Sequence, residues 1–152
     1  MFVFLDAGPL GLITAPQKST LEPVAIAQWV FDMEAAGHRF IVPAIADYEV
    51  RRELIRARKL RGINRLDTFN AADPERFLHI TETALSLAAE LWARARNAGT
   101  PTADAKELDC DILIAAQVLD VGLELSEFVI ATVNVGHLAR FPPADKWQNI
   151  KP

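Results

Sequence analysis

Several features that would point to particular protein classes are missing from this sequence of 152 residues. Cys110 is the one cysteine, so no internal disulfide can form and a reducing compartment is expected. The apolar N-terminal run, residues 1–5, is too short for a signal peptide or a membrane span. We therefore expect a cytoplasmic protein that makes no use of a membrane.

The residues needed for two common kinds of functional site are also absent. Neither glycine-rich phosphate fingerprint occurs, which argues against nucleotide-loop chemistry. The histidines, His38, His79 and His137, are scattered and provide no close pair of zinc ligands. The net charge of −4 gives no overall attraction to nucleic acid, so any such affinity has to be local.

The residues that are present form an ordinary globular composition, 51% hydrophobic and 24% charged. We expect one domain over residues 1–152, because no linker, repeat or low-complexity tract divides the chain. Short apolar runs alternate with helical patterns, which favours parallel strands covered by helices on both faces. The predicted fold class is a three-layer α/β/α domain with a mostly parallel sheet of four to five strands.

Apolar periodicity and turn residues locate the expected elements. Strands are predicted at 2–5, 39–42, 77–80 and 128–131, with an edge strand at 147–150. Helices are predicted at 10–14, 22–36, 44–60, 64–70 and 81–97, and from 109 to about 119 after a polar loop over 100–108. The last helix has apolar residues at every angle, which indicates a helix enclosed by protein, although its expected first turn is acidic.

Polar residues follow the predicted strands where the apolar runs end. Asp6 follows the first strand, Glu49 lies on the helix after the second, and Asn134 follows the fourth. Asp111 would enter from the start of the enclosed helix. Ligands of open α/β sheets bind beyond the carboxyl ends of the strands, so these side chains are expected to converge. Their oxygen atoms suit Mg²⁺, with Mn²⁺ as the alternative, and not zinc.

Each candidate also has a purely structural interpretation. Asp6 and Asn134 suit the N-caps of short helical turns, and Asp109 and Asp111 suit the first turn of their helix. Glu49 suits a solvated ion pair on its own helix. The hypothesis of a metal site therefore depends on these residues occurring together, and on no single one of them.

Four short segments carry a resemblance to a known family. They are Leu5-Asp6, Tyr48-Glu49, Asp111-Ile-Leu-Ile-Ala-Ala, and Thr132-Val-Asn134 before His137-Leu, and they span nearly the whole chain. In this order they resemble the motifs of PIN domains, especially the VapC-type toxin ribonucleases. The resemblance implies that Asp6, Glu49 and Asp111 are catalytic metal ligands, with Asn134 in the fourth catalytic position. Thr132 and Asp109 would support this set.

The resemblance also implies an activity and partners. The activity would be magnesium-dependent hydrolysis of RNA phosphodiester bonds by the toxin of a toxin–antitoxin pair. A small antitoxin protein and a second copy of the chain are the expected partners. Two departures matter: Val133 stands where the family commonly has a basic residue, and Asn134 replaces an acid, which favours one metal ion over two. Asp104 and Asp109 are further acids that could extend or replace the set.

Local positive charge is concentrated between Arg51 and Arg65. This is the one patch expected to hold an RNA backbone, and Arg51, Arg52 and Arg56 are the candidate contacts. Its structural alternative is a solvated helix end, where positive charge suits the helix dipole.

Two other functional interpretations remain beside the nuclease. A catalytically weak PIN-like module that acts by binding another protein is the main alternative. A phosphate-transfer receiver is disfavoured, because Asp6 has no acidic neighbour and no lysine follows the strand at 128–131.

Overall fold

The computed structural model describes residues 1–16, 21–98, 105–136, 138 and 141–152. The strands are β1 (Phe2–Leu5), β2 (Arg39–Pro43), β3 (Phe77–Leu78), β4 (Phe128–Thr132) and β5 (Ala144–Lys146). The helices are α1 (Ala7–Thr14), α2 (Leu21–Ala35), α3 (Ala44–Arg56), α4 (Leu60–Ala71), α5 (Glu82–Asn97) and α6 (Ala105–Asp120), and a short 3₁₀-helix spans Trp147–Asn149. Among the described helices, none combines the length and the apolar character needed to cross a membrane.

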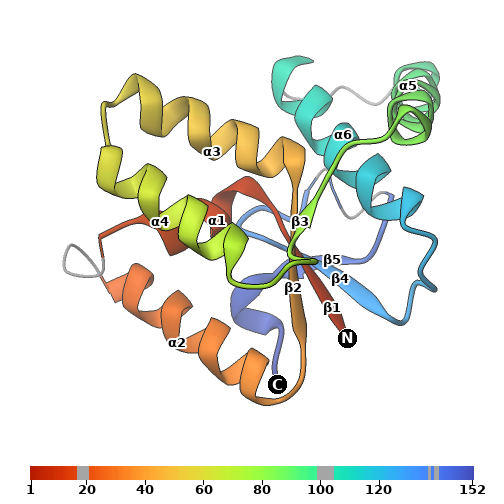
Figure 1. Ribbon diagram of the computed structural model, residues 1–152. Coiled ribbons are helices and arrows are strands. Elements are labelled where there is room, and N and C mark those ends of the chain that lie inside the picture. The colour runs from red at the N-terminus through yellow and green to blue at the C-terminus, as the bar shows by residue number, and fades with distance from the viewer. Residues whose placement is uncertain (17–20, 99–104, 137, 139–140) are drawn as a thin grey trace.

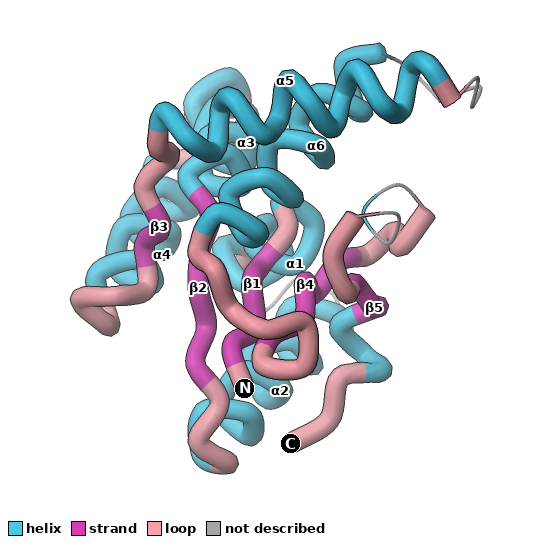
Figure 2. The backbone as a smooth tube through the Cα atoms, turned by 90° about the vertical axis from the view of Figure 1, so that its right-hand side faces the viewer, coloured by secondary structure: helices cyan, strands magenta, loops and turns pink. Residues whose placement is uncertain are grey.

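The strands pair in parallel to form one sheet in the order β3-β2-β1-β4-β5. Helices α1–α4 lie on one side of the strands and α5 and α6 on the other (Figures 1 and 2). The predicted three-layer α/β fold is therefore confirmed, with all pairings parallel. The strand order reverses between β1 and β4, and in such sheets the ligand crevice lies beyond the carboxyl ends of the strands at this reversal.

The enclosed helix is also confirmed, since α6 is buried on two sides. Ile114 and Val118 are fully buried in the main core, which also contains Phe4 of β1. Ile112 of α6 and Leu91 of α5 belong to a second apolar cluster between these two helices. The apolar residues at every angle of α6 are thus explained by the sheet side of the core and by α5.

Three predicted boundaries are wrong in ways that affect the site. The first helix begins at Ala7 and not at residue 10, so it follows Asp6 directly. The predicted helix over 44–60 is divided, because Arg58 adopts a φ of 54° and turns the chain between α3 and α4. Helix α6 begins at Ala105, inside the expected polar loop, so Asp109 and Asp111 lie in its second turn and not its first.

The predicted edge strand over 147–150 is also wrong. The edge strand is β5, which ends at Lys146, and the chain then forms the 3₁₀-helix. The apolar residues that suggested a strand are buried against α2: the rings of Trp147 and Trp29 lie 5.6 Å apart, and the indole N–H of Trp29 donates to the carbonyl of Ile150 at 2.8 Å. The apolar pattern over 147–150 therefore comes from packing against α2 and not from a strand.

A buried glutamine that the sequence did not single out holds α6 against its neighbours. Gln117 is 2% exposed. Its Oε1 accepts a hydrogen bond from the backbone N–H of Ile45 at 3.1 Å, and its Nε2 donates to the carbonyl of Leu78 at 3.1 Å. Ile45 lies in the first turn of α3, where backbone N–H groups have no helical partner. Gln117 therefore anchors both the start of α3 and the end of β3 to α6.

Replacing Gln117 by leucine tests this anchor. The change leaves the N–H of Ile45 and the carbonyl of Leu78 without their buried partner, so the free energy of unfolding should fall by about 2 kcal/mol. Urea denaturation followed by circular dichroism measures the loss. Gln28→Leu is the matched control, because Gln28 is exposed on α2, and its effect should stay within about 0.5 kcal/mol. Equal effects of the two changes would contradict the anchoring role.

Candidate active site

Asp6 lies at the junction of β1 and α1, where the strand order reverses. It is the N-cap of α1, and its Oδ1 accepts a hydrogen bond from the backbone N–H of Ala7 at 2.7 Å. Its Oδ2 accepts a hydrogen bond from the hydroxyl of Thr132 at 2.7 Å. Thr132 is fully buried at the end of β4. The carboxylate is therefore oriented by two elements that are distant in sequence and adjacent in the sheet.

The surroundings of Asp6 disfavour its charge. Burial raises the pKa of this carboxyl above its ordinary value, although the hydrogen bonds from Thr132 and Ala7 act in the opposite direction. Within the described residues, no lysine, arginine or histidine lies within ion-pair distance of Asp6. A partly buried carboxylate in this situation is stabilised by taking up a proton or by binding a metal cation.

The turn after β4 packs against the same corner. The hydroxyl oxygen of Thr132 accepts a hydrogen bond from the backbone N–H of Asn134 at 3.0 Å. The exposed Asn134 uses its Oδ1 to accept from the N–H of Gly136 at 3.2 Å, which closes the turn. A Cβ at Gly8 would lie 2.6 Å from Cγ2 of Val133, so the first turn of α1 and this turn meet closely. The structure thus brings Asn134 beside Asp6 through its main chain.

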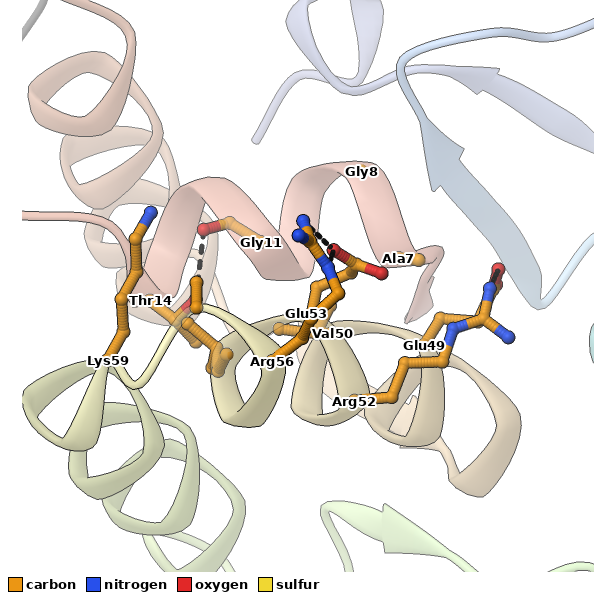
Figure 3. Close-up of a pocket in the computed structure, with 12 residues that line it drawn as sticks. Ala7, Gly8, Gly11, Thr14, Glu49, Val50, Arg52, Glu53, Arg56 and Lys59 are labelled. Atoms are coloured by element: carbon orange, nitrogen blue, oxygen red, sulfur yellow. Dashed lines mark hydrogen bonds and ion pairs between the residues drawn. The ribbon is translucent and has the colours of Figure 1, made fainter.

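Glu49 extends the site onto α3. Its side chain is 21% exposed, and its Oε1 lies 3.5 Å from Nη2 of Arg52. Ala7, Gly8 and Glu49 line one groove of about 430 Å³ between α1 and α3 (Figure 3). Glu49 therefore faces the same hollow as the residues that follow Asp6.

Glu49 also has a neighbour on α6. The pKa of the Cys110 thiol is raised to about 11, first by burial and then by the charge of Glu49 and a hydrogen bond to it. The charge of Asp111 acts on Cys110 in the same direction. Asp111 is half-buried and lies one residue along α6 from this contact. The packing of α3 against α6 therefore brings Glu49 to Cys110, the residue that precedes Asp111.

The donor chemistry of these residues fits a hard divalent cation, since every candidate group is a carboxylate or an amide oxygen. The structure pairs Asp6 with Thr132, and places Glu49 and Asp111 beside Cys110. Within the described residues, however, no three side chains of histidine, cysteine, aspartate or glutamate gather closely enough to hold a metal ion. The two halves of the site are therefore not joined into one ligand cluster. Asp104 and His137 lie outside the described residues.

Asp109 is directed elsewhere. Its Oδ1 accepts a hydrogen bond from the indole N–H of Trp92 at 3.0 Å, which places it at the surface between α6 and α5. Residues two apart on a helix do not share a face, so Asp109 and Asp111 point in different directions. A supporting role for Asp109 in catalysis stays a prediction, whereas its contact with Trp92 is a structural one.

The three arginines predicted to contact RNA are all paired with acids. Arg51 donates to both carboxylate oxygens of the buried Asp47, at 2.7 and 2.9 Å, and to Asp67 at 2.8 Å. These bonds raise the pKa of Arg51 and tie α3 to α4. Arg52 pairs with Glu49, and Arg56 pairs with Glu53 at 2.7 Å; Figure 3 shows both pairs along the groove. Their contact with RNA stays a prediction.

Comparison with known proteins supports the fold. No family model matches this sequence, and no curated protein is significantly similar to it. Three solved structures share the fold over 97% of this chain and 99% of theirs. They are VapBC2 from Rickettsia felis bound to a DNA fragment from its promoter, with a TM-score of 0.71 and 14% identity, and VapBC-1 from nontypeable Haemophilus influenzae, with a TM-score of 0.61 and 15% identity. The third is FitAcB from Neisseria gonorrhoeae, with a TM-score of 0.66 and 17% identity. These similarities confirm the PIN-like fold that the motifs predicted.

Asp6→Asn tests the electrostatic account of this corner. Below the ordinary pKa near 3.8 the carboxyl is protonated in both the folded and the unfolded chain, so its charge has no effect. As the pH rises through the raised pKa, the ionised carboxylate increasingly destabilises the metal-free fold. Asparagine keeps an oxygen for the N-cap and carries no charge. The variant should therefore be more stable than the parent at pH 8 in the presence of a chelator, and nearly equal to it at pH 4.

Thermal denaturation at the two pH values measures this difference. Asp32→Asn is the control, because it makes the same chemical change at an exposed carboxylate on α2. A loss of stability in Asp6→Asn that grows from pH 4 to pH 8 would contradict the assignment of burial as the dominant effect.

Proposed function

We propose that this PIN-fold chain is a magnesium-dependent endoribonuclease that hydrolyses RNA phosphodiester bonds, and that it is the toxin of a toxin–antitoxin pair. The observation that carries the proposal is the Asp6 carboxylate. It is partly buried at the reversal of the strand order, it is held by Thr132, and no described cationic side chain pairs with it. The motif resemblance and the likeness in fold to VapBC and FitAcB structures support the same proposal.

The proposed roles are those that the motif resemblance implies. Asp6 and Asp111 would hold the metal ion, and Glu49 and Asn134 would position the attacking water. Magnesium bound there supplies a Lewis acid for a phosphate oxygen and lowers the pKa of a bound water. Thr132 keeps the carboxylate of Asp6 in one orientation, which reduces the rearrangement needed for binding.

Two electrostatic features favour the proposed reaction. The N-terminus of α1 directs backbone N–H groups toward the Asp6 corner, and such a helix end attracts a phosphate. Asn134 is exposed at the same corner and carries no charge, so it adds no repulsion toward the substrate. A single metal ion is proposed, because an amide in the fourth position leaves less negative charge for a second ion.

The proposed partners are a small antitoxin and a second copy of the chain. The similar structures are named as VapBC and FitAcB complexes, which supports a partner of the first kind. Leu85 and Trp92, which are 49% and 41% exposed on α5, line one shallow groove with Ile112 and Leu113 of α6, and we propose this surface as a partner contact.

The alternative function is a catalytically weak PIN-like module that acts by binding another protein. The observation that favours it is the lack of a joined cluster of three metal-binding side chains within the described residues. The two functions differ in what the acids at the site do. The nuclease requires Asp6 and Asp111 for turnover, whereas the module does not.

A ribonuclease assay of the purified protein decides between them. Labelled single-stranded RNA should be cut with Mg²⁺ present and left intact with a chelator. Asp6→Asn and Asp111→Asn should each lower the rate by roughly 100-fold or more, a loss typical of a group that stabilises charge in the transition state. Gel analysis of the fragments measures the rates.

Asp32→Asn is the charge-matched control and should keep full activity, because Asp32 lies on α2 away from the groove. Thermal denaturation of each variant separates a loss of turnover from a loss of folding. Cutting that persists in a chelator, or that survives both aspartate changes in a folded protein, would refute the nuclease proposal.

A further inference from the structure

Three cationic side chains that lack an acidic partner among the described residues lie where α3 and α4 meet. The arginines predicted from the sequence as RNA contacts are neutralised by acids on their own helices, as described above. By contrast, the side chains of Arg58, Lys59 and Arg61 are exposed and form no hydrogen bond or ion pair with any described residue. We call these three residues the corner cations. They are the part of the basic segment that remains available to an outside ligand.

The corner cations line a groove of about 540 Å³ together with Arg65. No acidic side chain lines this groove among the described residues, although the whole chain carries a net charge of −4. Arg65 has a structural task, because its Nε donates to the carbonyl of Thr14 at the end of α1 at 2.6 Å. The groove is therefore a local positive site on an acidic protein, and it selects for a ligand with several negative charges.

This groove continues into the one beside Glu49. The two share Gly11, Thr14, Leu54 and Lys59, so together they follow α1 along its length. Figure 3 shows Ala7 and Glu49 at one end of this path and Thr14 and Lys59 at the other. At 1.5 Å per residue, the path from Ala7 to Thr14 is about 10 Å long. A chain held at the Asp6 corner can thus reach the corner cations within a few nucleotides.

The backbone at Arg58 supports a role for its side chain. Arg58 ends α3 in a left-handed conformation, with its N–H and that of Lys59 donating to carbonyls of the last turn. Glycine is the usual residue in this arrangement, because a side chain is strained there. The described left-handed residues after α2 and α6 are indeed glycines, Gly37 and Gly122. Strained residues concentrate at functional sites, and an arginine at this position is therefore informative.

We propose that the corner cations are a phosphate-binding subsite for an RNA strand whose scissile bond lies at the Asp6 corner. A polyanion with regularly repeated charge suits three adjacent cations, and such backbone contacts need no base recognition. The subsite relies on the proposed ribonuclease function for the identity of its ligand. In this proposal the corner cations position the substrate, and the predicted contacts Arg51, Arg52 and Arg56 do not.

The test measures RNA binding without cleavage. A fluorescent uridine dodecamer is titrated with protein in a chelator, and anisotropy is recorded at several salt concentrations. Changing Arg58→Gly, Lys59→Gln and Arg61→Gln together should weaken binding by tenfold or more and reduce the salt slope by about 2, as expected for three lost phosphate contacts on a single strand. The control is Arg94→Gln, Lys146→Gln and Lys151→Gln, which removes the same charge from residues that line neither groove.

The single variant Arg58→Gly separates side-chain function from folding. It should raise the melting temperature, because glycine relaxes the left-handed position, and it should still weaken RNA binding. Arg58→Lys keeps both the charge and the strain and should bind nearly as the parent does. Stabilisation without any loss of affinity would overturn the role assigned to Arg58.

The remaining outcomes are also decisive. Equal weakening by the corner triple and the control triple would show only an effect of net charge and would refute the subsite. Absence of RNA binding by the parent would refute it as well. Binding of a poly-glutamate peptide that the corner triple abolishes, with RNA binding unchanged, would assign the groove to a protein partner instead. Because this test measures binding and the earlier assay measures cleavage, failure of the subsite and failure of the ribonuclease give different results.

Discussion

The hydrogen bond from Thr132 to Asp6 joins the two strands between which the sheet reverses its order. It depends on the parallel pairing of β1 with β4, which sets Leu5 opposite Ala131 and so aligns the strand ends. Because Thr132 is fully buried, its hydroxyl has little freedom and orients the carboxylate. The start of α1, the turn after β4 and the proposed metal site are all built around this contact.

Helix α6 connects several of the other elements. It is buried between the core and α5, and Gln117 connects it to the start of α3 and the end of β3. In the same pair of packed helices, Glu49 of α3 contacts Cys110 of α6, the residue that precedes Asp111. Apolar burial provides most of the stabilisation, and the buried amide of Gln117 adds directional contacts between α6 and its neighbours.

Charge pairing divides the basic segment into two parts with different roles. Arg51, Arg52 and Arg56 are satisfied by carboxylates, and Arg51 in particular connects α3 to α4 through Asp47. Beyond the end of α3, no acidic side chain among the described residues lines the groove of Arg58, Lys59 and Arg61, so these corner cations stay available to a ligand. An acidic protein can in this way present a local site for a polyanion without an overall positive charge.

The sequence by itself determined the α/β class, the parallel sheet and the enclosed helix, because elements buried on two faces have apolar residues at nearly every position. It also identified Asp6 and Asn134 as residues at strand ends, because the change from an apolar run to turn residues is visible locally. It did not determine the helix break at Arg58 or the roles of Gln117 and the paired arginines. Each of these depends on a partner distant in sequence or on a backbone conformation that arginine rarely adopts. Only the tertiary structure decided which polar groups are satisfied, because that depends on which side chains meet after packing.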